Sequence, residues 1–239
     1  MNFDNHINWK EFEKKIGYSI IDTNIFLKAL THRSFLNENQ NYHNDSNERL
    51  EFLGDAILQF LISEELFVSY TQEPEGKLTN YRAATVNTNS LAKESLRLDF
   101  GKYLLMSVGE EQTGGRTKEY ILANTFESIL GAIYLDSKDI NICRQYLKTN
   151  LFYKIASIVK NNEYKDSKSA LQEITQEKYS ITPVYKIIAS DGPDHDKIFT
   201  VGVYIKSRLL ATGTGSSKQK AEQVAADNAL ENFNINPEG

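Results

Sequence analysis

The sequence is poor in the residues that build disulfide-stapled or zinc-bound proteins. Its 239 residues include one cysteine, Cys143, which excludes an internal disulfide and any cysteine-based zinc cage. We interpret Cys143 as a small apolar residue of a protein in a reducing compartment. The four histidines lack metal-ligand spacing such as HExxH, so no zinc enzyme is indicated; they are His6, His32, His43 and His195.

The chain also lacks long apolar runs and a basic excess. No stretch approaches the roughly 18 uninterrupted apolar residues of a membrane helix, and the start has no apolar run behind a basic segment, so we expect a cytoplasmic protein without a membrane. Lys and Arg number 27 against 32 Asp and Glu, and neither half is basic. This balance disfavours a protein that coats nucleic acid through an overall positive charge. Any contact with nucleic acid must therefore come from local groups of basic side chains.

The stretch Asn47 to Ala56, NERLEFLGDA, places three carboxylates on one face of a predicted helix. At about 100° per residue, Glu48, Glu51 and Asp55 fall within a narrow arc, and the apolar residues Leu50, Leu53, Ile57 and Phe60 gather roughly opposite. Two interpretations follow: a solvated acidic face of an ordinary amphipathic helix, or a site for a hard divalent cation, which binds carboxylate oxygens. Gly54 weakens the helix by about 1 kcal/mol relative to alanine, which suggests that another backbone passes close by.

The first 160 residues read as helical. Apolar spacing predicts two helices between Trp9 and Leu30, capped near Asp22 or Thr23, and a loop over 37–47 that ends in Asp45 and Ser46 as N-caps of the carboxylate helix. That helix should run to about Tyr70. Further helices are predicted over 77–98, 120–135 and 140–159, with a flexible polar loop over 109–119.

A short polar segment, residues 161–168, reads as a linker, and residues 169–239 then follow a helix–strand–strand–strand–helix pattern. The strands are predicted over 183–189, 199–205 and 208–213. The closing helix, 217–233, carries small residues on one stripe that let it lie close on a sheet. The fold class is therefore an all-α first domain, 1–160, followed by a small α+β domain.

Several segments resemble one known family in order. The stretch NERLEFLGDA is similar to the signature of the ribonuclease III family of double-strand-specific RNA endonucleases. LTHRSF at 30–35, EGKLTNYRAATVN at 75–87 and ILANTFESILGAIYLD at 121–136 resemble its other helices. The C-terminal SALQEITQEKY, GPDH and GTGSSKQKAEQVAA resemble a double-stranded-RNA-binding domain. The resemblance covers residues from about 5 to 235.

This resemblance implies a magnesium-dependent hydrolase that leaves 5′-phosphate and 3′-hydroxyl ends. In the family, the carboxylates matching Glu51, Asp55 and Glu127 bind Mg²⁺, for which Mn²⁺ can substitute. The residue matching Glu48 belongs to the same active-site cleft, called the catalytic valley. We therefore expect Glu48, Asp55 and Glu127 as catalytic residues. A metal can activate water and neutralise phosphoryl charge during such hydrolysis, and Mg²⁺ prefers hard oxygen ligands.

One position departs from the family pattern. The family usually has aspartate where this chain has Asn124, one turn before Glu127. An amide oxygen can still bind a cation but lacks the charge, so we include Asn124 in the metal site and expect weaker Mg²⁺ affinity. The alternative is a polar surface residue without a role.

The resemblance also implies a homodimer. In the family, the residue matching Phe52 inserts into a partner subunit, so Phe52 is the expected dimer contact. The default for an aromatic at that position is core packing.

In the second domain, the first helix should present Gln172, Glu173 and Gln176 to ribose 2′-hydroxyls of duplex RNA, unless these are ordinary solvated residues. The loop carrying His195 should enter the next minor groove, although a turn needs no such role. The last helix should offer its N-terminus to phosphate, with Ser217, Lys218 and Lys220 beside it and Ser216 and Gln219 as a capping box.

Two functions follow from these expectations. The first is a Mg²⁺-dependent endoribonuclease acting on structured RNA, such as ribosomal and messenger RNA precursors, without a small-molecule cofactor. The second is a non-catalytic dimer that binds duplex RNA. This alternative remains because Asn124 replaces an aspartate of the family's metal site.

Overall fold

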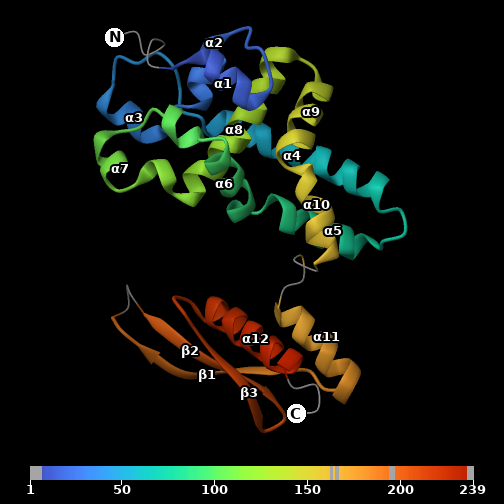
Figure 1. The fold of residues 1–239 in the computed structure, drawn as a ribbon. Helices are drawn as coiled ribbons and strands as arrows, with labels where there is room; N and C mark the ends of the chain where they lie inside the picture. Colours follow the sequence, from blue (N-terminus) through green and yellow to red (C-terminus); the bar gives the residue numbers. More distant parts are fainter. Residues whose placement is uncertain (1–6, 162–163, 165–166, 194–196, 236–239) are drawn as a thin grey trace. The chain divides into compact units, whose positions relative to one another are not determined.

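The computed structural model describes residues 7–161, 164, 167–193 and 197–235, and the chain divides after Tyr164 into two compact units (Figure 1). The first unit is helical. The second combines two helices with a three-stranded antiparallel sheet, so the predicted fold class is confirmed. Among the described residues, no helix is long and apolar enough to cross a membrane.

The first unit is built from helices of unequal length. They are α1 (Trp9–Ile16), α2 (Thr23–Ala29), α3 (Arg33–Glu38), α4 (Glu48–Ser69), α5 (Glu75–Val86), α6 (Thr88–Arg97), α7 (Val108–Gln112), α8 (Glu119–Ser137), α9 (Ile140–Asn150) and α10 (Ile155–Lys160), with 3₁₀ turns η2 (Phe100–Tyr103), η3 (Gly115–Thr117) and η4 (Phe152–Lys154). Asp22 caps α2 as predicted, because its carboxylate accepts a hydrogen bond from the Asn24 N–H at 2.9 Å.

Helix α8 lies at the centre of this unit (Figure 1). Its buried residues surround the helix, which is the pattern of a helix covered on all sides. Helix α4 packs along it and contributes Leu58, Leu61 and Ile62 to the same core as Phe126 of α8. The Ser128 hydroxyl donates to the Ala29 carbonyl at 2.8 Å and ties α8 to the end of α2.

The start of α4 differs from the prediction. Asn47, not Asp45 or Ser46, occupies the N-cap position, and its side chain makes no capping hydrogen bond. Asp45 instead pairs with Lys28 at 3.3 Å, and the Ser46 hydroxyl donates to Glu48 Oε2 at 2.9 Å. The predicted caps were wrong because both side chains have tertiary or side-chain partners that compete with the helix end.

The segment 109–119 is also more ordered than predicted. It contains most of α7 and all of η3, and Arg116 donates to the Gly101 and Leu104 carbonyls at 2.7 and 3.0 Å. Lys118 pairs with Glu110 at 2.6 Å. These side-chain bonds give the polar segment a defined structure, which composition alone does not indicate.

The helix predicted over 140–159 is interrupted. Leu151 has φ −142° and ψ −47°, which ends α9 and leads through η4 into α10. Phe60 also differs, since it was expected on the apolar face of α4 but is 56 % exposed.

The second unit contains α11 (Ser167–Tyr179), β1 (Val184–Asp191), β2 (Ile198–Ile205), β3 (Arg208–Gly215) and α12 (Lys218–Ile235), with strand order β1-β2-β3. The elements occur in the predicted order, although β1 and β3 each extend two residues beyond the predicted ends. Both helices lie on one side of the sheet (Figure 1). Their small core centres on Leu171, Val203 and the alanines of α12.

Helix α12 lies directly on β3, as its small residues predicted. A Cβ atom at Gly213 would lie 2.2 Å from the Ala225 nitrogen, and one at Gly215 would lie 2.6 Å from the Ala221 nitrogen. Glycine in the strand and alanine in the helix are therefore both needed for this approach.

Candidate active site

Two glycines bring α4 and α8 into backbone contact. A Cβ atom at Gly54 would lie 1.8 Å from the Glu127 carbonyl oxygen, and one at Gly131 would lie 2.3 Å from the Leu50 carbonyl oxygen. No side chain larger than hydrogen fits at either position while the helices keep this distance. The prediction that another backbone passes Gly54 is therefore confirmed, and that backbone carries Glu127.

This crossing brings the acidic face of α4 next to Asn124 and Glu127 of α8. The Asn124 side chain hydrogen-bonds to the Glu51 carboxylate. Burial, followed by the negative charges of Asp55 and Glu51, raises the pKa of Glu127 to about 8. Burial and the charge of Glu48 also raise the pKa of Glu51, although the hydrogen bond with Asn124 acts in the opposite direction.

The other two carboxylates are more exposed and have partners of their own. Glu48 lies 3.8 Å from the Arg33 guanidinium, and its Oε2 accepts the hydrogen bond from Ser46. Asp55 accepts a hydrogen bond from the Gln59 amide at 3.2 Å. The four predicted acidic residues thus share one region, in which Glu51 and Glu127 are the more enclosed members.

A pocket of about 350 Å³ opens beside these residues. It is lined by the N-cap and first residue of α3, the N-cap and first turn of α4, and the first turns of α8, namely His32, Arg33, Asn47, Glu48, Glu51, Tyr120, Ile121 and Asn124. Backbone hydrogen bonds hold its wall: His32 N–H donates to the Leu105 carbonyl at 2.8 Å, and Asn47 N–H donates to the Thr31 carbonyl at 2.9 Å. The LTHRSF segment therefore forms part of the site.

A divalent cation fits the donor set of this region. Glu51, Asp55, Asn124 and Glu127 offer hard oxygen ligands. The pKa values of Glu51 and Glu127 are raised first by burial and then by neighbouring carboxylates, and a bound cation would offset both effects. Within the described residues, no three acidic, histidine or cysteine side chains converge on one point. Without a cation, repulsion favours separate partners, such as Gln59 for Asp55.

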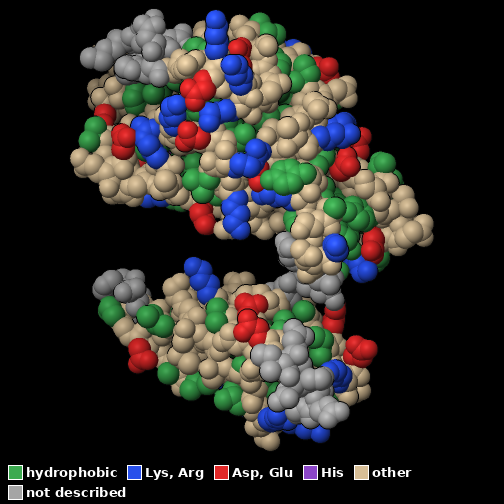
Figure 2. Space-filling view, in the orientation of Figure 1, with side chains coloured by type: hydrophobic (Ala, Val, Ile, Leu, Met, Phe, Trp, Pro, Cys, Tyr) green, Lys and Arg blue, Asp and Glu red, His purple; other side chains and the backbone are tan. Residues whose placement is uncertain are grey.

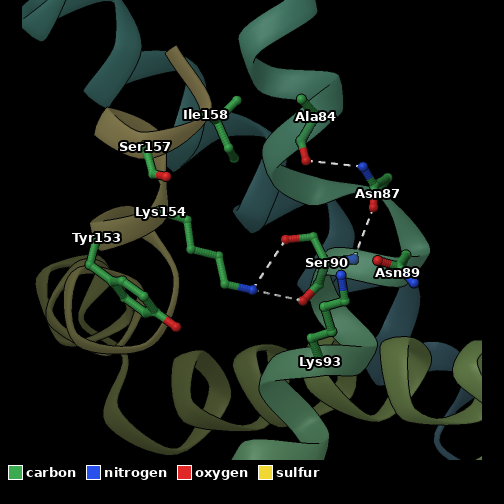
Figure 3. A pocket seen from close by; sticks show the side chains of 9 residues that line it. All are labelled: Ala84, Asn87, Asn89, Ser90, Lys93, Tyr153, Lys154, Ser157 and Ile158. Atoms are coloured by element: carbon green, nitrogen blue, oxygen red, sulfur yellow. Dashed lines mark hydrogen bonds between the residues drawn. The ribbon is translucent and has the colours of Figure 1, made fainter. Parts of the chain in front are cut away.

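A second pocket, of about 400 Å³, differs in that its polar groups already bond to one another (Figure 3). The Asn87 side chain donates to the Ala84 carbonyl at 3.0 Å and accepts from the Ser90 N–H at 2.9 Å. Lys154 donates to the Ser90 carbonyl at 3.1 Å and pairs with the buried Glu94 at 2.5 Å. Structural roles account for these side chains.

The second unit presents the predicted polar residues on the outward face of α11. Gln172, Glu173 and Gln176 are exposed, whereas Leu171 and Thr175 are buried on the opposite side. The three residues therefore form one accessible polar face.

The start of α12 differs slightly from the prediction. The cap is Ser217 and not Ser216, because the Ser217 hydroxyl accepts the Lys220 N–H at 3.2 Å. Lys218 and Lys220 are exposed in this first turn.

His195, the remaining predicted RNA contact, lies outside the described residues. Over the face of the molecule in Figure 2, basic and acidic side chains are interspersed.

Comparison with known proteins identifies the family. The family model described as Ribonuclease-III-like matches residues 22–155, more than half of the chain. The Ribonuclease 3 of a Nitratiruptor species is 43 % identical over 221 residues, which cover 92 % of this chain and 95 % of that protein. The chain belongs to the ribonuclease III family. The Ribonuclease 3 of Enterococcus faecalis is 40 % identical, with 93 % and 96 % of the two chains covered.

The two units of this ribonuclease III family member also match separately. A model described as Double-stranded RNA binding motif matches residues 167–233. The first unit is similar to the nuclease domain of ribonuclease III from Campylobacter jejuni, with a TM-score of 0.53, 39 % identity and coverage of 60 % of this chain and 98 % of that one. That structure is described as flexible in the region involved in dimer formation.

Three residues that line the pocket of this ribonuclease III family member, Arg33, Asn47 and Tyr120, are not predicted as site residues by the sequence. The sequence signals for them are the LTHRSF segment, which resembles a segment of the family, and the position of Asn47 directly before Glu48. Neither signal predicts that the LTHRSF segment and the start of α4, which a polar loop separates in sequence, together form one wall of the pocket.

Proposed function

We propose that the chain is a metal-dependent endoribonuclease that hydrolyses phosphodiester bonds of double-stranded RNA and leaves 5′-phosphate and 3′-hydroxyl ends. The observation that carries the proposal is the crossing of α4 and α8 at Gly54 and Gly131, which brings carboxylates of both helices together. The duplex-binding motif in the same chain supports double-stranded RNA as substrate. We propose structured precursors of ribosomal and messenger RNA, in the cytoplasm, as the natural targets.

In this proposal, Glu51, Asp55, Asn124 and Glu127 hold Mg²⁺, with Mn²⁺ as a substitute. When bound, the ion supplies charge neutralisation at the phosphate and activation of water. Glu127 is a metal-binding carboxylate held by the α4–α8 crossing, and Asn124 orients Glu51 through their hydrogen bond. Glu48 supports the same region through its contact with Arg33.

The second unit would hold the duplex by its shape. Gln172, Glu173 and Gln176 are accessible for hydrogen bonds with 2′-hydroxyls, and the loop with His195 is proposed for the next minor groove. The capped N-terminus of α12, with Ser217, Lys218 and Lys220, is proposed for a backbone phosphate. A non-catalytic binding protein is not favoured, because repelling carboxylates with raised pKa values would have no purpose there.

The test is cleavage of a long RNA duplex by purified protein across a range of Mg²⁺ and Mn²⁺ concentrations. Cleavage should require one of these ions and should spare duplex DNA. Glu127→Gln should reduce cleavage by roughly 10²-fold or more while duplex binding persists, because a preorganised charged group at the reaction centre commonly contributes that much. Binding without cleavage under every metal condition would overturn the enzyme proposal.

We also propose a homodimer in which Phe52 contacts the partner. Phe52 is 80 % exposed on α4, so the default of core packing does not apply, and Phe67 of the same helix is 72 % exposed. Large exposed aromatics on one helix are typical of an interface. Phe52→Ala should raise the dimer dissociation constant, measured by sedimentation, at least tenfold. Ile21→Ala, at a large apolar residue that is 77 % exposed outside α4, is the control; equal weakening by both would contradict the assignment.

A further inference from the structure

Asn47 is a buried polar residue without a partner for its side chain. It is only 3 % exposed, yet its amide makes no hydrogen bond within the described part of the chain. The amide is not among the fully buried side-chain groups that lack a partner, so its polar atoms reach the open space of a pocket, where a bound molecule can contact them. The side chain lines the 350 Å³ pocket beside the carboxylates.

The backbone of Asn47 is held on both sides. Its N–H donates to the Thr31 carbonyl at 2.9 Å, and its carbonyl accepts the Glu51 N–H at 2.8 Å. The amide is therefore placed at a defined position by α4 and the segment before α3. Asn87 starts a helix in the same way, but its amide bonds to Ala84 and Ser90 and needs no external partner.

The charges of the pocket indicate which group would bind there. Arg33 is offset by Glu48 at 3.8 Å, and Glu51 adds further negative charge. An anionic group would be disfavoured by this balance, whereas a neutral hydroxyl, which both donates and accepts, suits an amide that does the same. In an RNA duplex, that group is the ribose 2′-hydroxyl, which is absent from DNA.

We propose that Asn47 hydrogen-bonds a ribose 2′-hydroxyl next to the bond that is cut. The nuclease unit would then contribute to the choice of RNA over DNA, in addition to the second unit. This inference rests on the proposed endoribonuclease function.

The experiment uses the full chain and a short RNA duplex with a mapped cleavage site. Single 2′-deoxy substitutions are introduced at each of the flanking nucleotides, and single-turnover cleavage is measured. For the wild type, one position should lose about 3- to 10-fold in rate, the range for one neutral hydrogen bond. Asn47→Ala should lose a similar factor on the all-RNA duplex and should show no further loss at that position.

Asn47→Ser provides a second variant, because serine is a good N-cap and should keep α4 folded. It should behave as Asn47→Ala does. Asn87→Ala is the matched control, since it removes a helix-start asparagine from another pocket and should keep the wild-type sensitivity to every 2′-deoxy substitution.

Full sensitivity of both Asn47 variants at every position would overturn the inference while leaving the proposed function intact. The same duplexes are also made with single methylphosphonate linkages, which remove one phosphate charge. If the Asn47 variants lose sensitivity to a methylphosphonate but keep the 2′-deoxy sensitivity of the wild type, the amide contacts a phosphate and the inference is overturned. Failure of the wild type to cleave the all-RNA duplex would overturn the proposed function and this inference together.

Discussion

The two units place their candidate functional residues in opposite environments. In the helical unit, Glu51 and Glu127 lie partly buried between α4 and α8, and burial and neighbouring carboxylates raise their pKa values. In the second unit, Gln172, Gln176 and Lys218 are exposed on the outside of a small core.

This difference follows from what each unit would do. A site for a cation needs charges that are held together against their repulsion, which requires a rigid crossing of helices. A surface that recognises the shape of a duplex needs accessible hydrogen-bonding groups and positively charged side chains at defined spacing, which a small domain can provide. The helical unit should therefore be sensitive to packing changes, and the second unit to changes of surface charge.

The largest effect is expected from Gly54→Ala. The new Cβ would meet the Glu127 carbonyl oxygen at 1.8 Å, so α4 and α8 must separate. We expect a loss of about 1–3 kcal/mol in the free energy of unfolding, despite higher helix propensity, and roughly 10²-fold slower cleavage from the displaced carboxylates. Thermal unfolding and single-turnover cleavage measure both.

Gly76→Ala is the control for this prediction. Gly76 lies in α5 with no atom within 4 Å of the added Cβ, so the substitution should stabilise by up to about 1 kcal/mol and leave cleavage unchanged. Similar behaviour of the two variants would contradict the importance of the crossing.

In the second unit, Lys218→Ala combined with Lys220→Ala should weaken duplex binding roughly tenfold at low salt. It should also reduce the slope of log Kd against log salt by about 1 for each lysine that contacts phosphate. Cleavage at saturating RNA should change little. Lys186→Ala removes one lysine from the sheet, where its ammonium lies over the Tyr204 ring, and should leave the slope unchanged.

A smaller effect is expected from Asn124→Asp. The added carboxylate should lower the metal concentration needed for half-maximal cleavage, by roughly tenfold or less, because ligand charge increases cation affinity. It should also destabilise the metal-free protein, since the hydrogen bond to Glu51 is replaced by repulsion. Exposed Asn80→Asp, in α5, is the control. An unchanged metal requirement in Asn124→Asp would refute this account of the position.

The smallest effect concerns pH and a buried carboxylate that, unlike Glu127, has cationic partners. Burial alone would raise the pKa of Glu94, but hydrogen bonds with Lys154, Arg97 and Tyr153 outweigh it and lower the pKa below 4.5. Because the folded pKa is lower than the unfolded one, this stabilisation is present above about pH 4.5 and is lost as pH falls through the folded value.

Each unit of that pKa difference corresponds to about 1.4 kcal/mol. Urea unfolding from pH 7 to pH 3 should therefore show a smaller acid-dependent loss for Glu94→Gln than for the wild type. Glu75→Gln, at an exposed carboxylate in the first turn of α5, should keep the wild-type acid dependence. Equal acid dependence in Glu94→Gln and the wild type would contradict the role of this group.

Much of the fold followed from local patterns. The helical first region, the order of elements in the second and the close approach at Gly54 were predicted from apolar periodicity, small residues and glycine placement. The cap of α4 and the ordered segment 109–119 were not, because Asp45 and Arg116 bond to groups far away in sequence or to backbone that only the fold brings near.

The sequence by itself determined the acidic face of one helix, the polar face of another and the family that both resemble, because periodicity and motif order are local properties. The tertiary structure alone decided which of these residues share one site. Glu127 acquires a pKa of about 8 only because Gly54 and Gly131 let α4 and α8 touch. Asn47 lines a pocket with residues from α8 because its N–H bonds to the Thr31 carbonyl, which holds the starts of α3 and α4 together.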